Sequence, residues 1–376
     1  MRDGPNSSIS VVLDSQPRIQ REWGLRGFIE MLDTEGVLVR VRERVHWKLD
    51  IGRITRECGL PLLFEVIEDY PESYVFTNGL YDAGAIALSL GLGFNTTLSA
   101  LVNEARARLR APVPPEIIET RTLPTSYVDP GTVNLLSLPV PLWDKSEKGR
   151  YIGTWHINVS RDPETGERNL GVYRMQVMDA LHATVNVSKG SHLFEHIAKA
   201  EREGRPLPMA VAIGVPEAVM IAAGAAYPRG GDEYELAGAL LQRPVKLIRC
   251  GTVDLEVPSE SEIIIEGLIQ PHVRVVDGPF FDYSGKPDQN PDAFLFEATR
   301  LVHRRNPIFR GAAVGRPGAE DHQLFAFLAQ IGLLDFHGSR ARHTVQNFFV
   351  RQRCFRAFQW TGRARSLLTM PGKKRK

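Results

Sequence analysis

The chain has 376 residues, of which 43% are hydrophobic and 24% charged, so it can build two domains with substantial cores and shows no sign of disorder. Its net charge of +2 is unevenly distributed: residues 340–376 hold 11 Lys and Arg and no Asp or Glu, which leaves 35 basic against 44 acidic side chains elsewhere. The three cysteines are far apart and form no Cys-x-x-Cys motif, so the sequence implies neither a disulfide framework nor a zinc knuckle. With no apolar run long enough to span a bilayer and no secretion signal in the first residues, we expect a soluble, cytoplasmic protein.

The first part of the chain predicts a small α/β domain over residues 18–115. Apolar residues recur at helical spacing from Trp23 to Leu32, and Gly36 separates them from a β-like run at 37–41. Further strands are expected at 62–66 and 74–76, and helices at 85–92 and 97–109. The proline-rich stretch 111–115 cannot continue a helix and marks the end of the domain.

From residue 116 to 322 the pattern turns toward β and predicts a second, mixed domain, so the fold class is α+β. Strands at 155–160 and 170–177 flank the turn sequence of residues 162–166 and predict a hairpin. Helices are expected at 193–203 and 234–241, and strands at 209–215, 245–248, 254–257 and 262–265. No Walker loop and no Gly-x-Gly-x-x-Gly after a strand is present, so Gly-rich dinucleotide binding is not supported.

Two acids on a tight apolar turn, Asp277 and Asp282, form the most informative pattern together with Arg174 upstream. We expect the acid that pairs with Arg174 to stay ionised. Aromatic neighbours should desolvate the other acid, which we take to be Asp282, and hold its proton near neutrality. This arrangement predicts an acid/base site. The alternative is a pair of loop carboxylates that support the Gly278-Pro279 turn.

The same residues resemble the UbiD-type decarboxylases, whose motif Asn-x-Gly-x-Tyr-Arg matches Asn169-Leu170-Gly171-Val172-Tyr173-Arg174 and is followed by an acidic Gly-Pro motif. Further stretches similar to the family run in order along residues 20–322. They are Val133–Pro141, Arg150-Tyr151-Ile152, Arg161–Gly166, Asp254–Pro258 and Gly315-Arg316-Pro317.

The resemblance implies a split β-barrel domain that binds prenylated FMN, with Arg174, Asp277 and Asp282 as the catalytic triad. It also implies that Asn169, His192 and Glu233 bind a divalent metal, Mn²⁺ or Mg²⁺, which bridges the cofactor phosphate. Arg174 counts as a cofactor contact as well, and K⁺ is a further candidate ion. The alternatives that give these residues no functional role are a hairpin with a surface arginine, a helix N-terminus near His192 and a solvated Glu233.

The implied function is non-oxidative decarboxylation, or the reverse carboxylation, of a small aromatic or α,β-unsaturated carboxylic acid, with a flavin prenyltransferase supplying the cofactor. In this mechanism Arg174 orients the substrate carboxylate, Asp277 holds Arg174, and Asp282 protonates the carbon. Two departures from the family stand out: Asp277 where glutamate is usual, and Phe281 in place of a small glycine. A shorter acid can weaken the contact with Arg174, and the phenyl ring can narrow the pocket.

Relatives usually continue into a third domain, whereas here we expect only a short helical tail over residues 323–376. A lysine that this domain gives to the cofactor has no assignable counterpart. A cofactor-binding or weakly active subunit of a larger assembly is therefore the alternative function. A remote alternative from another class is a zinc peptidase, since His192-Leu193-Phe194-Glu195-His196 spells the inverted zinc-protease signature.

The tail contains aromatic and apolar residues at helical spacing among arginines, which predicts a basic amphipathic helix at 340–362. Because the resembled family commonly oligomerises through its C-terminal region, we expect this helix to clasp a neighbouring subunit of a homo-oligomer. Contact with an anionic membrane surface is the second alternative. The aromatic face argues against nucleic acid.

Overall fold

The computed structural model describes residues 24–119, 124, 126–228 and 230–334. Near the N-terminus, parallel and antiparallel pairing builds a four-stranded sheet with the order β1-β2-β3-β14. Its strands are β1 (Val39–Val41), β2 (Leu62–Phe64), β3 (Tyr74–Thr77) and β14 (Ile308–Arg310). The helices of this part are α1 (Leu25–Thr34), α2 (Asp50–Cys58), α3 (Ala83–Ser89) and α4 (Leu98–Arg108). Because β14 comes from far along the chain, the N-terminal sheet is completed by a late segment.

The second part is built on a seven-stranded sheet with the order β5-β13-β12-β9-β6-β7, in which β8 also pairs with β13. Its strands are β5 (Tyr127–Val128), β6 (His156–Arg161), β7 (Arg168–Gly171), β8 (His182–Val185), β9 (Leu207–Ile213), β12 (Ile263–Phe281) and β13 (Pro287–Arg304). A small third sheet joins β4 (Glu116–Ile117), β10 (Lys246–Arg249) and β11 (Glu256–Pro258). The other helices are a 3-10 turn (Leu135–Ser137), α5 (His192–Arg202), α6 (Glu217–Ala223), α7 (Glu233–Leu241) and α8 (Glu320–Ile331).

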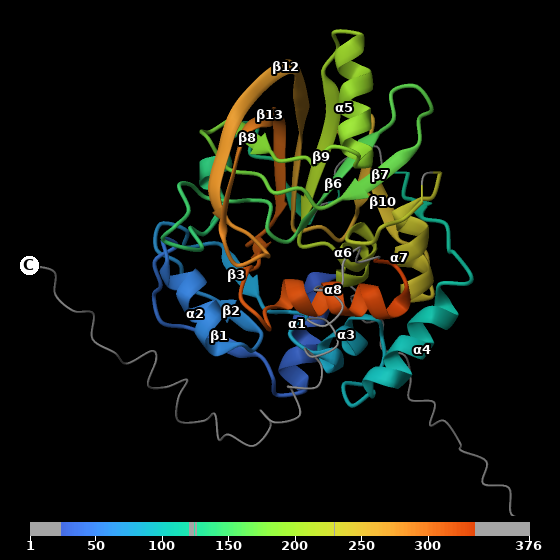
Figure 1. The fold of residues 1–376 in the computed structure, drawn as a ribbon. Helices are drawn as coiled ribbons and strands as arrows, with labels where there is room; N and C mark the ends of the chain where they lie inside the picture. The colour runs from blue at the N-terminus through green and yellow to red at the C-terminus, as the bar shows by residue number, and fades with distance from the viewer. Residues whose placement is uncertain (1–23, 120–123, 125, 229, 335–376) are drawn as a thin grey trace, which may run out of the picture.

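The central strand β9 shows why this sheet is apolar on both faces. Ala210 and Ala212 pack into one hydrophobic core, and Met209, Val211 and Ile213 pack into another. A strand that is covered on both faces reads as a continuous apolar run instead of an alternating one. In Figure 1 the long β12 and β13 curve together beside α5, and α8 lies between them and the N-terminal helices.

The expected mixed fold is confirmed, and the helices predicted near 23–32, 97–109, 193–203 and 234–241 are present as α1, α4, α5 and α7. In the described ranges no strand pairing closes the large sheet into a barrel. The predicted domain boundary at 322 falls within α8, and the predicted tail helix at 340–362 lies outside the described residues. None of the helices in these ranges has the length and hydrophobicity of a membrane span.

Candidate active site

A cavity of about 790 Å³ opens between the large sheet and α8. Three strands contribute to its wall: β7 with the loop that follows it, and the ends of β12 and β13. The first residues of α5 and α7 and the loop after α6 also belong to the wall. Five of the six expected site residues lie on this wall, namely Asn169, Arg174, Asp282, His192 and Glu233. The sixth, Asp277, lies behind Arg174.

Arg174 and Asp277 form a buried ion pair. Asp277 Oδ1 lies 2.6 Å from both Nε and Nη2 of Arg174, and Oδ2 accepts a 2.6 Å hydrogen bond from the Thr184 hydroxyl. Asp277 is fully buried within β12, and burial raises its pKa against the opposing effects of Arg174 and Thr184. The guanidinium lies 5.3 Å from the centre of the Phe280 ring. These contacts hold Arg174 in one orientation at the cavity wall.

The loop that carries Arg174 is shaped by the residues just before it. A Cβ atom on Gly171 would lie 2.3 Å from the Tyr173 ring, so only glycine lets this ring fold back over the end of β7. The backbone N–H of Tyr173 donates to the side chain of Asn158 on β6. The chain thus leaves the strand before Arg174, which is how Asn169 and Arg174 both reach the same cavity.

Asp282 has a different environment from the one that we expected. Its Oδ1 accepts hydrogen bonds from the backbone N–H and the hydroxyl of Ser284, so it supports the turn that joins β12 to β13. Tyr283 beside it is exposed and contacts Phe325 of α8. Asp282 is only partly buried, and the fully buried acid is Asp277, the one that pairs with Arg174.

Asp288 is a site residue that sequence reasoning missed. It lies on β13 opposite Phe280 and accepts a 2.7 Å hydrogen bond from Nη1 of Arg174. It also lines the cavity. No sequence signal pointed to it because β13 itself was not predicted, and only the pairing of β12 with β13 brings it to Arg174.

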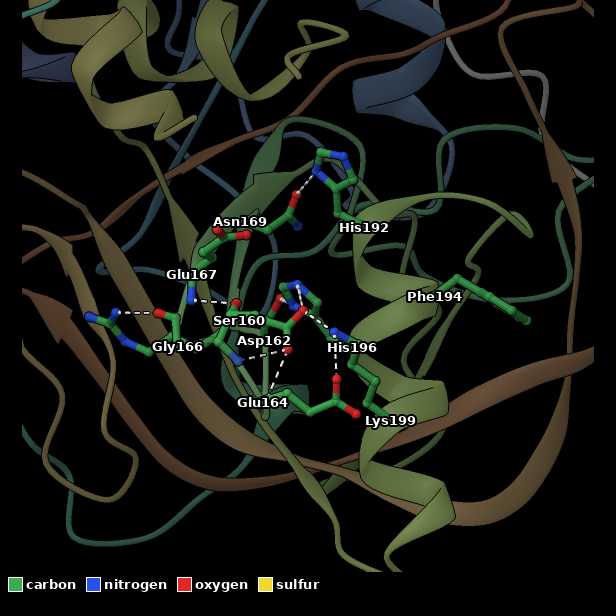
Figure 2. Close-up of polar contacts among 12 residues, drawn as sticks. Ser160, Asp162, Glu164, Gly166, Glu167, Asn169, His192, Phe194, His196 and Lys199 are labelled. Carbon is green, nitrogen blue, oxygen red and sulfur yellow. Dashed lines mark hydrogen bonds and ion pairs between the residues drawn. The ribbon is translucent and has the colours of Figure 1, made fainter. Parts of the chain in front are cut away.

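Asn169, His192 and Glu233 all lie on the cavity wall. Figure 2 shows Asn169 and His192 in contact, with 3.2 Å between Asn169 Oδ1 and His192 Nδ1. Glu233 Oε2 accepts a 3.0 Å hydrogen bond from the N–H of Leu170 beside Asn169. Ser191 caps α5 and Asp232 caps α7, which places both ligand candidates at the starts of helices. Burial raises the pKa of Glu233 to about 7.

His196 does not join His192 in a metal site. Figure 2 shows the two histidines of α5 reaching different partners, because His196 Nδ1 contacts the buried Ser160 hydroxyl at 3.0 Å. Its Nε2 lies 3.9 Å from Asp162, which is itself bound by Lys199. In the ranges that the structure covers, no three His, Cys, Asp or Glu side chains converge on one point. The zinc peptidase is therefore not supported.

Two family models match the chain. The 3-octaprenyl-4-hydroxybenzoate carboxy-lyase Rift-related domain covers residues 118–317, and the N-terminal domain of the same family covers 29–105. The chain is similar to a phenolic acid decarboxylase of Sedimentibacter hydroxybenzoicus, with 33% identity over 82% of this chain and 67% of the relative. It is also 30% identical to the pyrrole-2-carboxylic acid decarboxylase of Pseudomonas aeruginosa, over 82% of this chain and 65% of that protein.

Solved structures agree with this similarity. The vanillic acid decarboxylase of Sedimentibacter hydroxybenzoicus in its closed form matches with a TM-score of 0.77 and 32% identity, over 81% of this chain and 67% of that one. The UbiD-class enzyme HmfF from Pelotomaculum thermopropionicum in complex with FMN matches with a TM-score of 0.73 and 33% identity, with the same coverage. An evolved dimeric form of HmfF in complex with prFMN matches with a TM-score of 0.74 and 30% identity, over 88% of this chain and 83% of that one.

The chain spans about two thirds of the length of the curated relatives it matches, with 66% and 65% for two uncharacterized proteins from Aquifex aeolicus and Archaeoglobus fulgidus. Within that span both family domains occur in order, and most of the cavity wall lies on the larger of them. The chain therefore belongs to the UbiD family of 3-octaprenyl-4-hydroxybenzoate carboxy-lyase proteins.

Proposed function

We propose that this chain catalyses the non-oxidative decarboxylation, or the reverse carboxylation, of a small aromatic or α,β-unsaturated carboxylic acid with the help of prenylated FMN. The observation that carries the proposal is the Arg174–Asp277 pair, which presents a fixed guanidinium to a cavity large enough for a ligand. Relatives named as decarboxylases of phenolic and pyrrole carboxylic acids, and neighbours with bound FMN or prFMN, support the same conclusion.

Loss of carbon dioxide from an sp² carbon leaves electrons that no amino-acid side chain can delocalise. Prenylated FMN, when bound, supplies the electron-accepting ring for this chemistry. The protein's own task is to position the acid and to move one proton. Arg174 binds the substrate carboxylate through its N–H groups, and Asp277 fixes the plane of the guanidinium.

Asp282 is the proton donor in this proposal. It lines the cavity, and of its two carboxylate oxygens only Oδ1 takes part in a hydrogen bond within the described part of the chain, which leaves Oδ2 for a proton. Asp282 is partly exposed at the turn. It therefore takes its proton from solvent, instead of keeping the proton by burial in an apolar pocket.

Asn169, His192 and Glu233 would hold a divalent cation, Mn²⁺ or Mg²⁺, next to the cofactor phosphate. Their donor atoms are an amide oxygen, an imidazole nitrogen and a carboxylate, a mixed and mostly hard set that suits these ions. The residues fit such a site, because all three line one cavity and two of the donor atoms, Asn169 Oδ1 and His192 Nδ1, lie 3.2 Å apart. The proposal assigns no residues to K⁺.

The test uses the chain co-expressed with a flavin prenyltransferase. We expect a flavin absorption spectrum, a cofactor mass that includes the prenyl group, and stoichiometric divalent metal. Carbon dioxide release is then measured on a panel of benzoic, cinnamic and heteroaromatic acids. A flavin-loaded chain that releases none with any of them would instead favour the alternative, a cofactor-binding subunit of a larger assembly.

Glu233→Ala should empty the site of metal and lower the bound flavin at least tenfold, because one of three ligands is lost. The matched control is Glu235→Ala on the same first turn of α7, since Glu235 does not line the cavity. Retention of stoichiometric metal and flavin by Glu233→Ala, measured by metal analysis and absorbance, would remove this residue from the ligand set.

A further inference from the structure

Arg174 makes polar contacts along its whole guanidinium group. Nε and Nη2 face Asp277, and the side-chain amide group of Asn186 lies 2.8 Å from Nε and 2.9 Å from Nη2. Nη1 contacts Asp288 at 2.7 Å. The carboxylate of Asp288 thus occupies the Nη1 end of the arginine, on the cavity side.

The two acids that hold Arg174 differ in burial. The side chain of Asp277 is 0% exposed and that of Asp288 is 51% exposed. Removing Asp277 from the arginine would leave a buried, unpaired charge, which is costly. Asp288, in contrast, can exchange the arginine for water at little cost, because exposed ion pairs contribute little to stability.

An acid substrate needs the same donor. A carboxylate that enters the cavity to be held by Arg174 finds Nε and Nη2 already used by Asp277 and Asn186, and Nη1 used by Asp288. Of these three partners, only Asp288 is an acid that is both exposed and part of the cavity lining. The exchange leaves Nη1 of Arg174 paired with one carboxylate both before and after the substrate binds.

We propose that Asp288 is an internal carboxylate that occupies Nη1 of Arg174 in the empty site and is displaced by the carboxylate of the substrate. This inference rests on the proposed function, because it takes a carboxylic acid as the ligand. Asp288 is then a specificity-determining residue: it weakens binding of every acid by a constant factor and leaves neutral aromatic ligands unaffected. Ligands without a carboxylate gain nothing at Nη1, which stays covered by Asp288.

The experiment measures equilibrium binding of benzoate and of its neutral counterpart benzamide by ligand-observed NMR. It uses the full chain co-expressed with a flavin prenyltransferase. Asp288→Asn should bind benzoate about threefold more tightly than the wild type or better, the ratio expected for removing an exposed competing ion pair. The affinity for benzamide should stay the same. Asp292→Asn is the matched control, because Asp292 is an exposed acid on the same strand with no contact to Arg174.

Three results would overturn the inference: an unchanged or weaker benzoate affinity in Asp288→Asn, an equal gain in Asp292→Asn, or no benzoate binding by either Asp288→Asn or the wild type. An equal gain in the control would show a general charge effect. The outcome is separable from that of the proposed function. If Asp288→Asn binds benzoate more tightly but no acid is turned over, the displacement is supported and the decarboxylase function is contradicted. If acids are turned over but the benzoate affinity is unchanged, the decarboxylase function is supported and the displacement is contradicted.

Discussion

Two aspartates pair with Arg174 and a third, Asp282, lines the same cavity, and their surroundings give them different chemistry. Asp277 is sealed in the sheet, Asp282 is held by a turn, and Asp288 stands at the cavity surface. The same side chain can therefore fix the arginine, carry a proton or compete with a ligand, according to its burial and hydrogen bonds. A substitution at each position should have a distinct signature.

Asp282→Asn should abolish turnover and leave flavin binding intact. An amide keeps the shape and the hydrogen bonds from Ser284 but cannot deliver a carboxylic proton. For a positioned general acid we expect a loss of about 10²-fold or more in kcat. The measurement is carbon dioxide release, with flavin absorbance as the check on cofactor loading. Decarboxylation at a near wild-type rate would exclude Asp282 as the proton donor.

Glu147 should make the stability of the protein depend on pH. It is 7% exposed, one of its oxygens accepts from the N–H groups of Trp143 and Asp144, and the other has no hydrogen-bond partner among the described residues. Burial raises its pKa from 4.5 to about 7. Because the folded-state pKa is the higher one, protonated Glu147 contributes to the stability of the folded protein. This contribution is fully present below pH 4.5 and is lost as the pH rises to about 7.

The corresponding test compares the wild type with Glu147→Gln in urea unfolding at several pH values. Between pH 4.5 and 7 the free energy of unfolding of the wild type should fall by about 3 kcal/mol relative to the variant, since each pKa unit corresponds to about 1.4 kcal/mol. Two curves that stay parallel across this range would show that the carboxyl group does not titrate with a raised pKa.

At the scale of the elements, local patterns predicted α1, α3, α4, α5 and α7 but missed α2, α6 and α8, and they predicted the long strands poorly. Helices such as α5 combine an N-cap serine with apolar residues at helical spacing, and both signals lie within one short segment. Only the beginning of β12 was predicted, because Gly267, Pro271 and Gly278 interrupt its sequence as turn residues would. Pairing with β13 overrides these interruptions through several register shifts, and this pairing is not visible in a local window.

The site residues divide in the same way, into those found from motifs in the sequence and those that depend on strand pairing. Asn169, His192 and Glu233 were found from family motifs, and the structure brings them to one cavity. The burial of Asp277 and the contact of Asp288 with Arg174 depend on β12 and β13, so the sequence could not assign them. The turn at Asp282 had a usable signal in Asp282-Tyr283-Ser284-Gly285, where an aspartate commonly accepts from the N–H two residues on.

At the scale of the whole molecule, one buried arginine links the N-terminal sheet to the cavity wall. Arg310 of β14 contacts Glu217 at the start of α6 and Glu320 at the start of α8, at 2.7 and 2.5 Å. Glu320 also accepts from the backbone N–H groups of Asn78 and Leu80 after β3, and Glu217 accepts from the Trp155 indole. Through Trp155, which lines the cavity, the network ties the site to the N-terminal part.

Arg310→Met should therefore destabilise the protein by about 3–5 kcal/mol, because it leaves two carboxylates buried without their cation. The matched control is Arg40→Met. Arg40 lies on β1 of the same sheet as Arg310 and also pairs with two carboxylates, but its side chain is 33% exposed, so its loss should cost less than about 1 kcal/mol. Urea unfolding followed by circular dichroism measures both values. If Arg310→Met does not fold, Glu320→Gln, which keeps the side-chain shape and removes one charge, takes its place and should still cost more than Arg40→Met. Equal losses for the buried and the exposed arginine variants would contradict a linking role for this network.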